Sequence, residues 1–496
     1  MTFSSDYEAL KNLSFRASLF EGINMLLEWD QETYMPQDAT SIRAEQRTLL
    51  SEMSHSIRTS SEYSQLVERL AHNKQASLEE KANLKSWHRD YEKNKKLPLE
   101  FVREFTETTS KAMASWQDAK KNNDFTLFAP SLEKIVELVR KKADLIGYKD
   151  HPYDALIDDY EPNCTTCELD ELFSKIKAPI SDLFQNASKR YESIKKSDID
   201  SKLTSSEQID LCRSLLQWIG FDLHKGRLDL SSHPFCSSYH PTDCRLTTRK
   251  ESQGLFSQLL STLHELGHGL YDLGLQEKNY GTPLGLYCSL GIHESQSRFW
   301  ETRIGMSKPF WKFLLPKMKE LYPKDFSSYS VDDVYTELNR VEPSFIRTES
   351  DELSYPLHII LRYEIEKELV CGKLNVFEIP ERWNEYMKKF FNITPPSDAK
   401  GCLQDIHWSM GFFGYFPTYT LGNIFGAQLF SSFEKEFSDW EKKVALGQFD
   451  FIKSYLLEKI WKWGRFYDSK ELVQTASNMP LSSEYYLEYL RKKYSD

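Results

Sequence analysis

The sequence lacks the segments that would place it in or across a membrane. Nowhere do 18 apolar residues follow one another, which is the length that a helix needs to cross a bilayer. The nearest run, from Met410 to Leu421, is short and contains two glycines and a proline. The first seven residues also lack the basic stretch and the apolar run of a secretory signal. These absences predict a soluble, cytoplasmic protein with no membrane partner.

The sequence also lacks a dense cysteine framework and an excess of positive charge. Eight cysteines are scattered over 496 residues, without the dense framework that staples small secreted domains. Cys164-Thr165-Thr166-Cys167 is a lone CxxC motif, and because a zinc ribbon needs four ligands we expect it to have no function. The 63 basic residues are outnumbered by 74 acidic ones, giving a net charge of −11. This balance argues against a nucleic-acid partner, which a basic surface would attract.

Helical periodicity is what the sequence has in abundance. Apolar residues recur at three- and four-residue spacing, with charges between them, in the stretches 7–30, 41–54, 168–195, 256–273, 351–369 and 450–466. The best strand candidates lie between about Phe235 and Arg249. No repeat or Gly/Pro/Ser-rich linker divides the chain. We therefore predict a mainly α protein with a single domain over residues 1–496, in which residues 1–120 form a helical layer or lid.

The most specific motif is His264-Glu265-Leu266-Gly267-His268, within the predicted helix 256–273. Histidines four positions apart lie on one helix face, about 5–6 Å apart at Cβ, and can share a metal ion. Zinc lowers the pKa of a bound water to about 7, and a neighbouring carboxylate such as Glu265 can take its proton as the water attacks a carbonyl. This pattern predicts a hydrolytic zinc site.

An ordinary helix with two partly buried histidines is the alternative interpretation of this segment. Gly267 and Gly269 argue against it, because each costs a helix roughly 1 kcal/mol relative to alanine. Local inconsistencies of this kind are expected at functional sites.

A catalytic zinc ion needs a third protein ligand and an open position. The metzincin pattern would place a histidine where this chain has Gly274, so that class is excluded. Glu294 lies further along, where a second helix can return a carboxylate to the metal. We favour it over the adjacent His293, which points about 100° away on a helix, because two histidines and one glutamate form an established ligand set. The alternative for Glu294 is an ion pair with Arg298 at i+4.

Further segments form an ordered pattern with the two metal motifs. They are Trp29 to Pro36, His233-Pro234-Phe235, Asp243-Cys244-Arg245-Leu246-Thr247, Ile346 to Glu352, and Gly401 to Trp408. Together with His264 to His268 and His293 to Ser297, this pattern resembles the carboxypeptidase Taq family of zinc metallocarboxypeptidases along essentially the whole chain. Small departures are Ser350, where the family usually has alanine, and residues 37–40, where it often has glycines.

The resemblance implies the fold and the assembly. It implies an elongated, helical, gluzincin-type peptidase fold with a deep cleft and a small β-sheet beside the HExxH helix, and commonly a homodimer. The active-site motifs then lie within residues 230–425.

The resemblance also implies residues that bind the substrate. A carboxypeptidase must hold a free C-terminal carboxylate, and the planar fork of arginine can make two parallel charge-assisted hydrogen bonds to it. By resemblance, Arg347 is the anchor, while Arg245 and Asp243 shape the wall beside the substrate strand. The alternatives are local salt bridges, of Arg347 with Glu349 or Asp351 and of Arg245 with Asp243.

The reaction needs donors for the oxyanion that forms at the attacked carbonyl. His407 is one candidate, and either Tyr415 or Tyr419 is a second, although core packing is the commoner role for tyrosines in so aromatic a stretch. His233 is assigned to substrate binding with its motif. His358 offers no mechanism of its own and is expected to be a core or supporting residue.

The predicted function is therefore zinc-dependent release of C-terminal amino acids from peptides, with Glu265 as general base. One zinc ion per chain is expected, and cobalt or manganese are possible substitutes. One rival is a zinc oligoendopeptidase with the same metal core and a structural Arg347. Another is a helical zinc-binding interaction protein without catalysis. Glu265 argues against the latter, since a structural zinc site usually fills its fourth position with a protein ligand.

Overall fold

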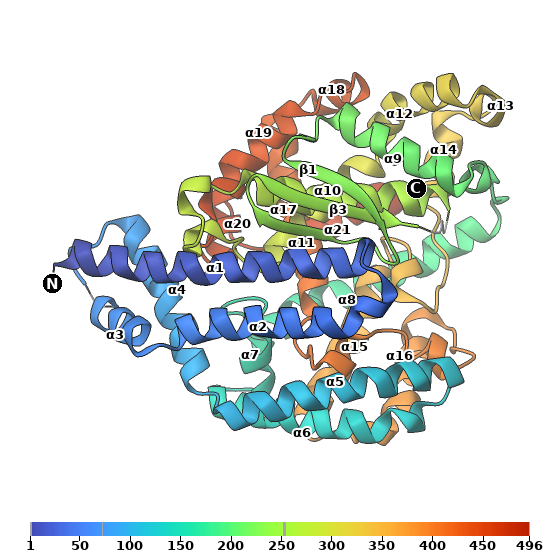
Figure 1. The fold of residues 1–496 in the computed structure, drawn as a ribbon. Coiled ribbons are helices and arrows are strands. Elements are labelled where there is room, and N and C mark those ends of the chain that lie inside the picture. Colours follow the sequence, from blue (N-terminus) through green and yellow to red (C-terminus); the bar gives the residue numbers. More distant parts are fainter. Residues whose placement is uncertain (1, 72, 251–253, 496) are drawn as a thin grey trace. The chain divides into compact units, whose positions relative to one another are not determined.

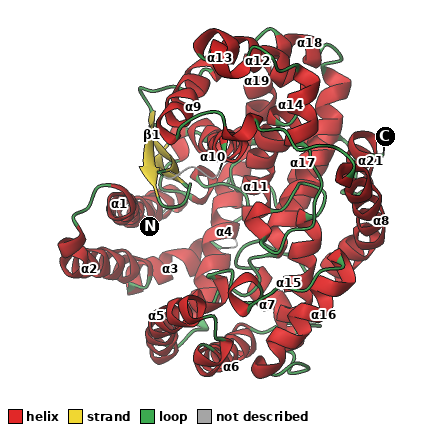
Figure 2. Ribbon diagram, turned by 90° about the vertical axis from the view of Figure 1, so that its right-hand side faces the viewer, coloured by secondary structure: helices red, strands yellow, loops and turns green. Residues whose placement is uncertain are grey.

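The computed structural model describes residues 2–71, 73–250 and 254–495, and most of them are helical. The strands that it describes form one small three-stranded sheet, drawn in yellow in Figure 2. This confirms the predicted fold class, a mainly α protein with a small β-sheet. Among the described residues, no helix combines the length and the apolar character that crossing a bilayer requires.

The predicted helical stretches all contain helices. They are α1 (Phe3–Thr33), α2 (Thr40–Arg58), α8 (Thr166–Glu192), α10 (Leu255–Gly274), α15 (Tyr355–Val370) and α19 (Asp450–Lys459). Helix α15 begins later than the predicted residue 351. The reason is that the Asp351 carboxylate accepts the backbone N–H groups of Leu353 and Ser354, which closes a turn before the helix.

The chain groups into two compact units. The first contains the residues up to Glu92, Ser197–Leu338 and Leu429–Pro480, and the second contains Lys93–Lys196, Asn339–Gln428 and the residues from Leu481 on. The predicted N-terminal layer, residues 1–120, is therefore shared between both units. A single domain over residues 1–496 stays a prediction.

The first unit holds the sheet, α1, α2, α10, α19 and a further set of helices. These are α3 (Ser61–Leu70), α9 (Ser205–Ile219), α11 (Leu290–Arg298), α12 (Lys308–Leu321), α13 (Pro323–Phe326), α14 (Val331–Leu338), α18 (Trp440–Ala445) and α20 (Ser469–Ser477). Its core includes the fully buried side chains of Trp300, Trp311 and Tyr271.

The second unit holds α8, α15 and the helices α5 (Leu99–Asn122), α6 (Ala129–Ile146), α7 (Pro152–Ile157), α16 (Ile379–Phe391) and α21 (Glu484–Tyr494). Its core includes Tyr153 and Tyr363, whose ring centroids lie 5.5 Å apart. Two helices belong to both units. Helix α4 (Leu78–Lys95) begins in the first unit and ends in the second, and α17 (Pro417–Glu436) begins in the second unit and ends in the first.

The sheet has β3 (Asp243–Arg249) at its centre, parallel to β1 (Gly226–Ser231) and antiparallel to β2 (Cys236–His240). Strands β2 and β3 confirm the strand prediction near 235–249, whereas β1 was missed. In β1 the polar residues Asp229 and Ser231 take the buried positions, whereas Leu228 and Leu230 are half-buried, so the apolar residues do not mark its buried face. Asp229 is satisfied there because it accepts hydrogen bonds from Tyr34 and Arg227.

Helix α10 packs against the sheet and against α11 (Figure 1). A glycine of α10 lies at each of these contacts. A Cβ atom added to Gly269 would lie 2.8 Å from Cys244 Sγ on β3. A Cβ atom added to Gly267 would lie 2.5 Å from the carbonyl oxygen of Gln296 and 2.6 Å from Ser297 Cα on α11. Both glycines therefore serve the packing of the helix that carries the HExxH motif.

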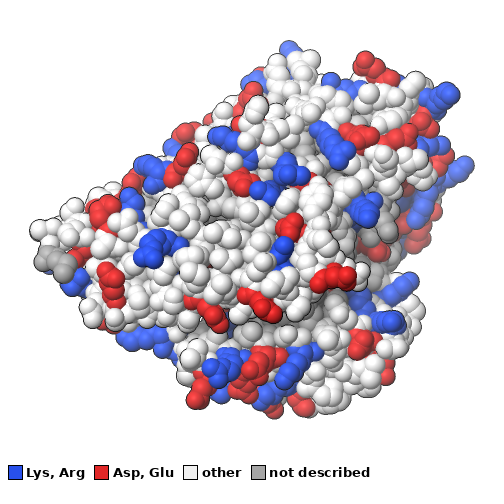
Figure 3. Space-filling view, in the orientation of Figure 1, with Lys and Arg blue, Asp and Glu red and all other residues white. Residues whose placement is uncertain are grey.

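The surface of the described residues carries both signs of charge. On the face drawn in Figure 3, Lys and Arg side chains alternate with Asp and Glu side chains. This mixture agrees with the small acidic excess in the sequence.

The glycine contacts predict opposite effects for two Gly→Ala substitutions. Gly267→Ala should lower the free energy of unfolding by about 1–3 kcal/mol, because the new methyl group overlaps backbone atoms of α11. Gly22→Ala, in α1, meets its nearest neighbour at an ordinary 3.5 Å and should raise that free energy by up to about 1 kcal/mol. Urea unfolding of both variants measures the difference. Equal effects would contradict the close approach at Gly267.

Candidate active site

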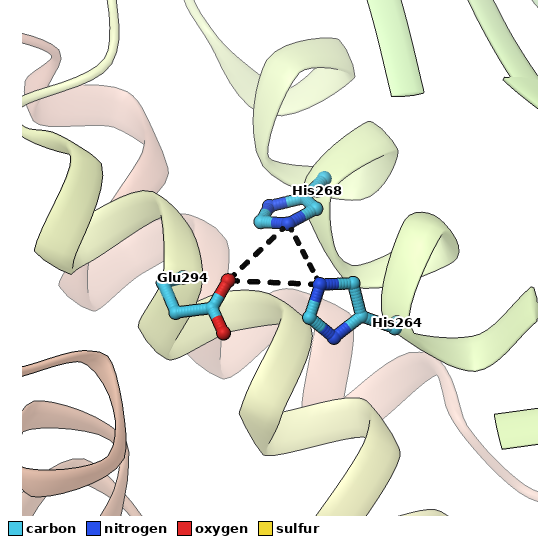
Figure 4. A group of neighbouring side chains, drawn as sticks. All are labelled: His264, His268 and Glu294. Carbon is cyan, nitrogen blue, oxygen red and sulfur yellow. Dashed lines mark hydrogen bonds and ion pairs between the residues drawn. The ribbon is translucent and has the colours of Figure 1, made fainter. Parts of the chain in front are cut away.

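Three side chains from two neighbouring helices converge on one point (Figure 4). His264 and His268 come from α10, and Glu294 comes from α11. The Nε2 atoms of the two histidines lie 3.2 Å apart, and each lies 3.6 Å from Glu294 Oε2. In the described part of the chain, these three residues form a group of possible metal ligands, and their ligand atoms all lie within 4.8 Å of one another.

This triangle has the size that a divalent transition metal requires. The point equidistant from the three atoms lies about 2.0 Å from each of them, which matches the zinc bond lengths of about 2.0–2.2 Å to histidine nitrogen and carboxylate oxygen. Three protein ligands leave a fourth position open, as in catalytic zinc sites. The residues present therefore fit a catalytic divalent metal ion.

His293, the alternative third ligand, and Arg298, the alternative ion-pair partner of Glu294, both contact other carboxylates. His293 Nε2 lies 3.1 Å from Asp272 Oδ1, and the His293 ring stacks on the His268 ring with centroids 4.4 Å apart. Arg298 donates a hydrogen bond to Glu301 Oε2 at 2.8 Å. Glu294, rather than His293, thus completes the cluster.

A further carboxylate reaches the opposite side of the first ligand. Glu301 Oε2 lies 2.7 Å from His264 Nδ1. Sequence reasoning did not single out Glu301 or Asp272. The spacing of seven residues from Glu294 to Glu301 gave no usable signal, because an unbroken α-helix would carry Glu301 about 10 Å further along the axis.

Glu265, the predicted general base, is only 7% exposed. Burial raises the pKa of this carboxyl group to about 7, with a further upward contribution from Glu294 and a downward one from His264. A general base works best when its pKa lies near the operating pH. The environment of Glu265 therefore suits proton transfer.

Arg245 and Asp243 form the local ion pair that was the alternative interpretation. Arg245 Nε and Nη2 donate to the two oxygens of Asp243 at 3.0 and 3.1 Å. The guanidinium group also lies over the ring of Trp29, 4.4 Å from its centroid. His233 lies exposed between β1 and β2.

In the second unit, Arg347 is buried and bound to a carboxylate that sequence reasoning did not anticipate. Its Nε and Nη2 atoms donate to Asp405 Oδ1 at 3.1 and 2.9 Å, and its Nη1 atom donates to the Tyr355 hydroxyl at 3.0 Å. The alternatives considered from the sequence were Glu349 and Asp351. The observed partner instead comes from the Gly401 to Trp408 motif, so two of the motifs meet here.

Arg362, which is fully buried, shares the same carboxylate. Its Nε atom donates to Asp405 Oδ2 at 2.7 Å, and its Nη2 atom donates to Gln404 Oε1 at 2.7 Å. Burial alone would raise the pKa of Asp405, but Arg362 and Arg347 hold it well below its ordinary range. Two guanidinium groups against one carboxylate leave a positive charge in this cluster, which suits an anionic ligand.

His407 and the two candidate tyrosines lie together in the second unit. His407 Nε2 lies 3.2 Å from the Tyr419 hydroxyl, whereas Tyr415 meets His407 by its ring, with centroids 5.3 Å apart. Burial lowers the pKa of His407 to about 3, so the imidazole is neutral at pH 7. His358 is fully buried and stacked on Phe391, as expected for a core residue.

Comparison with known proteins assigns these motifs to one family. A family model described as Carboxypeptidase Taq (M32) metallopeptidase matches residues 9–494. Thermostable carboxypeptidase 1 of Pyrococcus furiosus is 38% identical over 471 residues, covering 95% of this chain and 94% of that protein. Carboxypeptidase 1 of Bacillus subtilis is 36% identical over 482 residues, covering 97% and 96%. A solved Pyrococcus furiosus carboxypeptidase, described as Apo-Mg, gives a TM-score of 0.96 at 36% identity over 99% of both chains.

The shared carboxylate predicts a large loss of stability for Asp405→Asn. Removing this charge leaves two buried guanidinium groups uncompensated, so the free energy of unfolding should fall by about 3–5 kcal/mol at pH 7. The exposed Asp118→Asn on α5 is the control and should change it by less than about 0.5 kcal/mol. Urea unfolding midpoints measure both.

The loss of stability in Asp405→Asn is expected to depend on pH. Because the pKa of Asp405 is depressed in the folded state, its contribution is fully present above the ordinary aspartate pKa of about 3.9 and is lost as pH falls below it. The difference between the original protein and Asp405→Asn should therefore narrow below about pH 4. If Asp405→Asn were as stable as Asp118→Asn at pH 7, the stability of the cluster would not depend on the charge of Asp405.

Proposed function

Since the chain belongs to the carboxypeptidase Taq (M32) family and is a metallocarboxypeptidase, we propose that His264, His268 and Glu294 hold its metal ion and that this ion is zinc. The observation that carries this proposal is the triangle of ligand atoms with edges of 3.2, 3.6 and 3.6 Å. The nitrogen and carboxylate donors suit zinc, one per chain, and also admit cobalt or manganese.

Glu265 is the proposed general base. A bound zinc ion supplies Lewis acidity, which lowers the pKa of water and polarises the carbonyl of the scissile bond. Glu265 takes the proton of the attacking water and passes it to the leaving amine. Its burial and its raised pKa, about 7, support both transfers, because the group can gain and lose a proton near neutral pH.

Arg347 is the proposed anchor for the C-terminal carboxylate of the substrate. The support is the excess of positive charge in its cluster, where Arg347 and Arg362 both pair with the single carboxylate of Asp405. Arg362 is fully buried, whereas Arg347 keeps 7% of its surface exposed. The hydrogen bonds to Asp405 thus hold the guanidinium group of Arg347 in one orientation, in which it is proposed to bind the carboxylate of the substrate. Membership of the carboxypeptidase family sets aside the oligoendopeptidase and the non-catalytic zinc protein.

The remaining candidates are proposed to contact the substrate. Tyr419 is favoured over Tyr415 as the partner of His407 at the oxyanion, because its hydroxyl group lies within hydrogen-bonding distance of the imidazole. Arg245 and Asp243, which are joined by two hydrogen bonds, are proposed to shape the wall beside the substrate strand, together with His233. A cytoplasmic location and a homodimer, expected from the sequence and the family resemblance, stay proposals.

Replacement of the base is expected to separate metal binding from turnover. Glu265→Gln should lower kcat by about 10²- to 10⁴-fold while the zinc content stays that of the original protein, because Glu265 is not a ligand. Timed mass spectrometry of an unblocked peptide, with and without a chelator, gives both the rate and the end that shortens. The exposed Glu277→Gln is the control. Full turnover in Glu265→Gln with zinc retained would remove the base from the mechanism.

Replacement of the anchor should change the preference for a free C-terminus. Arg347→Gln leaves Asp405 paired with Arg362, so the fold should survive, while kcat/KM for a free-carboxylate peptide should fall by at least about tenfold. The original protein should cleave an amidated peptide poorly, and kcat/KM for this peptide should change little in Arg347→Gln. The exposed Arg103→Gln, on α5, serves as control. An unchanged ratio of the two rates would exclude Arg347 as the anchor.

A further inference from the structure

Both ring nitrogens of His264 face carboxylates that come from one continuous stretch of chain. Nε2 lies 3.6 Å from Glu294 Oε2, and Nδ1 lies 2.7 Å from Glu301 Oε2. The side chain of Glu301 is 16% exposed, and that of His264 is 23% exposed. The imidazole is therefore held between two acidic groups, one on the side of the proposed metal position and one behind it.

The backbone that carries Glu301 departs from the α-helix at this point. Helix α11 ends at Arg298, and Phe299–Gly305 continues it as a π-helix, in which the N–H of Met306 donates to the carbonyl oxygen of Glu301 five residues earlier at 3.1 Å. On an unbroken α-helix, Glu301 would stand about 10 Å further along the axis than Glu294. Because a wider turn advances the chain less per residue, the π-helix redirects the side chains that follow Arg298.

Such turns are rare, and they are frequent at functional sites. Here the segment also packs closely on α10, because a Cβ atom added to Gly305 would lie 2.5 Å from Leu263 Cδ1. Leu263 directly precedes His264. The π-helix is thus fitted against the turn of α10 that carries the first ligand.

Arg298 completes the arrangement. Its Nη1 atom donates to Glu301 Oε2 at 2.8 Å, so this oxygen lies within hydrogen-bonding distance of both the guanidinium group and the imidazole. Arg298 is only 7% exposed. A charge-assisted hydrogen bond at such a site fixes the direction of the carboxylate.

We propose that Glu301, carried by the π-helical turn and held by Arg298, is a positioning residue that accepts the Nδ1 hydrogen of His264 and so presents Nε2 to the metal ion. This inference rests on the proposed metal site. The acceptor fixes the tautomer and the orientation of the ring and makes Nε2 a better donor. Glu301 does not touch the substrate or the metal ion.

The second ligand has a different support. The ring of His293 stacks on that of His268 at an interplanar angle of 13°, and His293 is itself oriented by Asp272. Loss of Glu301 should therefore loosen one of the two imidazoles. The expected result is a weaker metal site that still forms.

The test compares zinc affinity in full-length variants stripped of metal, by competition with a chromophoric chelator. Glu301→Ala should weaken zinc binding by about 10- to 100-fold, and Glu301→Gln should weaken it less, because an amide oxygen can still accept from Nδ1. Glu320→Gln, an exposed charge removal on α12, should bind zinc as the original protein does. The visible spectrum of the cobalt-loaded protein should change in the Glu301 variants alone, which a loss of general stability would not produce.

Glu294→Ala separates this inference from the proposed function. If Glu294→Ala loses zinc while both Glu301 variants bind it with the original affinity, the role of Glu301 is refuted and the ligand set stands. If Glu294→Ala keeps the original affinity, the proposed site itself fails, and the role of Glu301 with it. Should Glu301→Ala not fold because its hydrogen bond with Arg298 is lost, Glu301→Gln alone decides, and an unchanged affinity and cobalt spectrum overturn the proposal.

Discussion

The backbone contact between α10 and α11 at Gly267 is the constraint on which the rest of the metal site depends. Only a glycine lets the Gln296 carbonyl and Ser297 Cα approach that position so closely. This approach brings Glu294 Oε2 to 3.6 Å from both imidazoles. Glycine at this position lowers the helix propensity of α10. The missing methyl group leaves room for the backbone of α11, and this close packing positions the ligand Glu294.

One buried cluster in each unit carries an excess of charge, and the sign of that excess differs between the two clusters. In the first unit, Glu294, Glu301 and Glu265 surround the histidine pair, which favours a cation. In the second unit, Arg347 and Arg362 outnumber Asp405, which favours an anion. A peptidase that acts at a free C-terminus needs both preferences, one for its metal ion and one for the substrate carboxylate. The distribution of buried charge therefore agrees with the activity of the family.

The sequence predicted the features that depend on local spacing. The His264 and His268 pair and its Glu265 neighbour follow from helix periodicity, and Glu294 follows from the ligand chemistry of zinc. Residues that act through long-range contacts were not predicted. The partner of Arg347 is Asp405, in another motif, and no local rule pairs them.

Two other features were missed because they break the usual patterns. Strand β1 alternates polar and apolar residues, but it buries Asp229 and Ser231 rather than Leu228 and Leu230, so the apolar residues do not mark its buried face. Glu301 reaches His264 through a π-helical turn, and the spacing rules of an α-helix do not predict the direction of its side chain. In both cases the tertiary contacts of the segment, and not its local pattern, decide which side chains are buried or turned toward α10.

The most direct measurement of the central claim is X-ray absorption at the zinc edge of the loaded protein, combined with an anomalous-difference map of its crystals. The account predicts one zinc ion among His264, His268 and Glu294, with nitrogen and oxygen neighbours at about 2.0–2.2 Å. A sulfur neighbour at about 2.3 Å, or an anomalous peak away from these three residues, would contradict it.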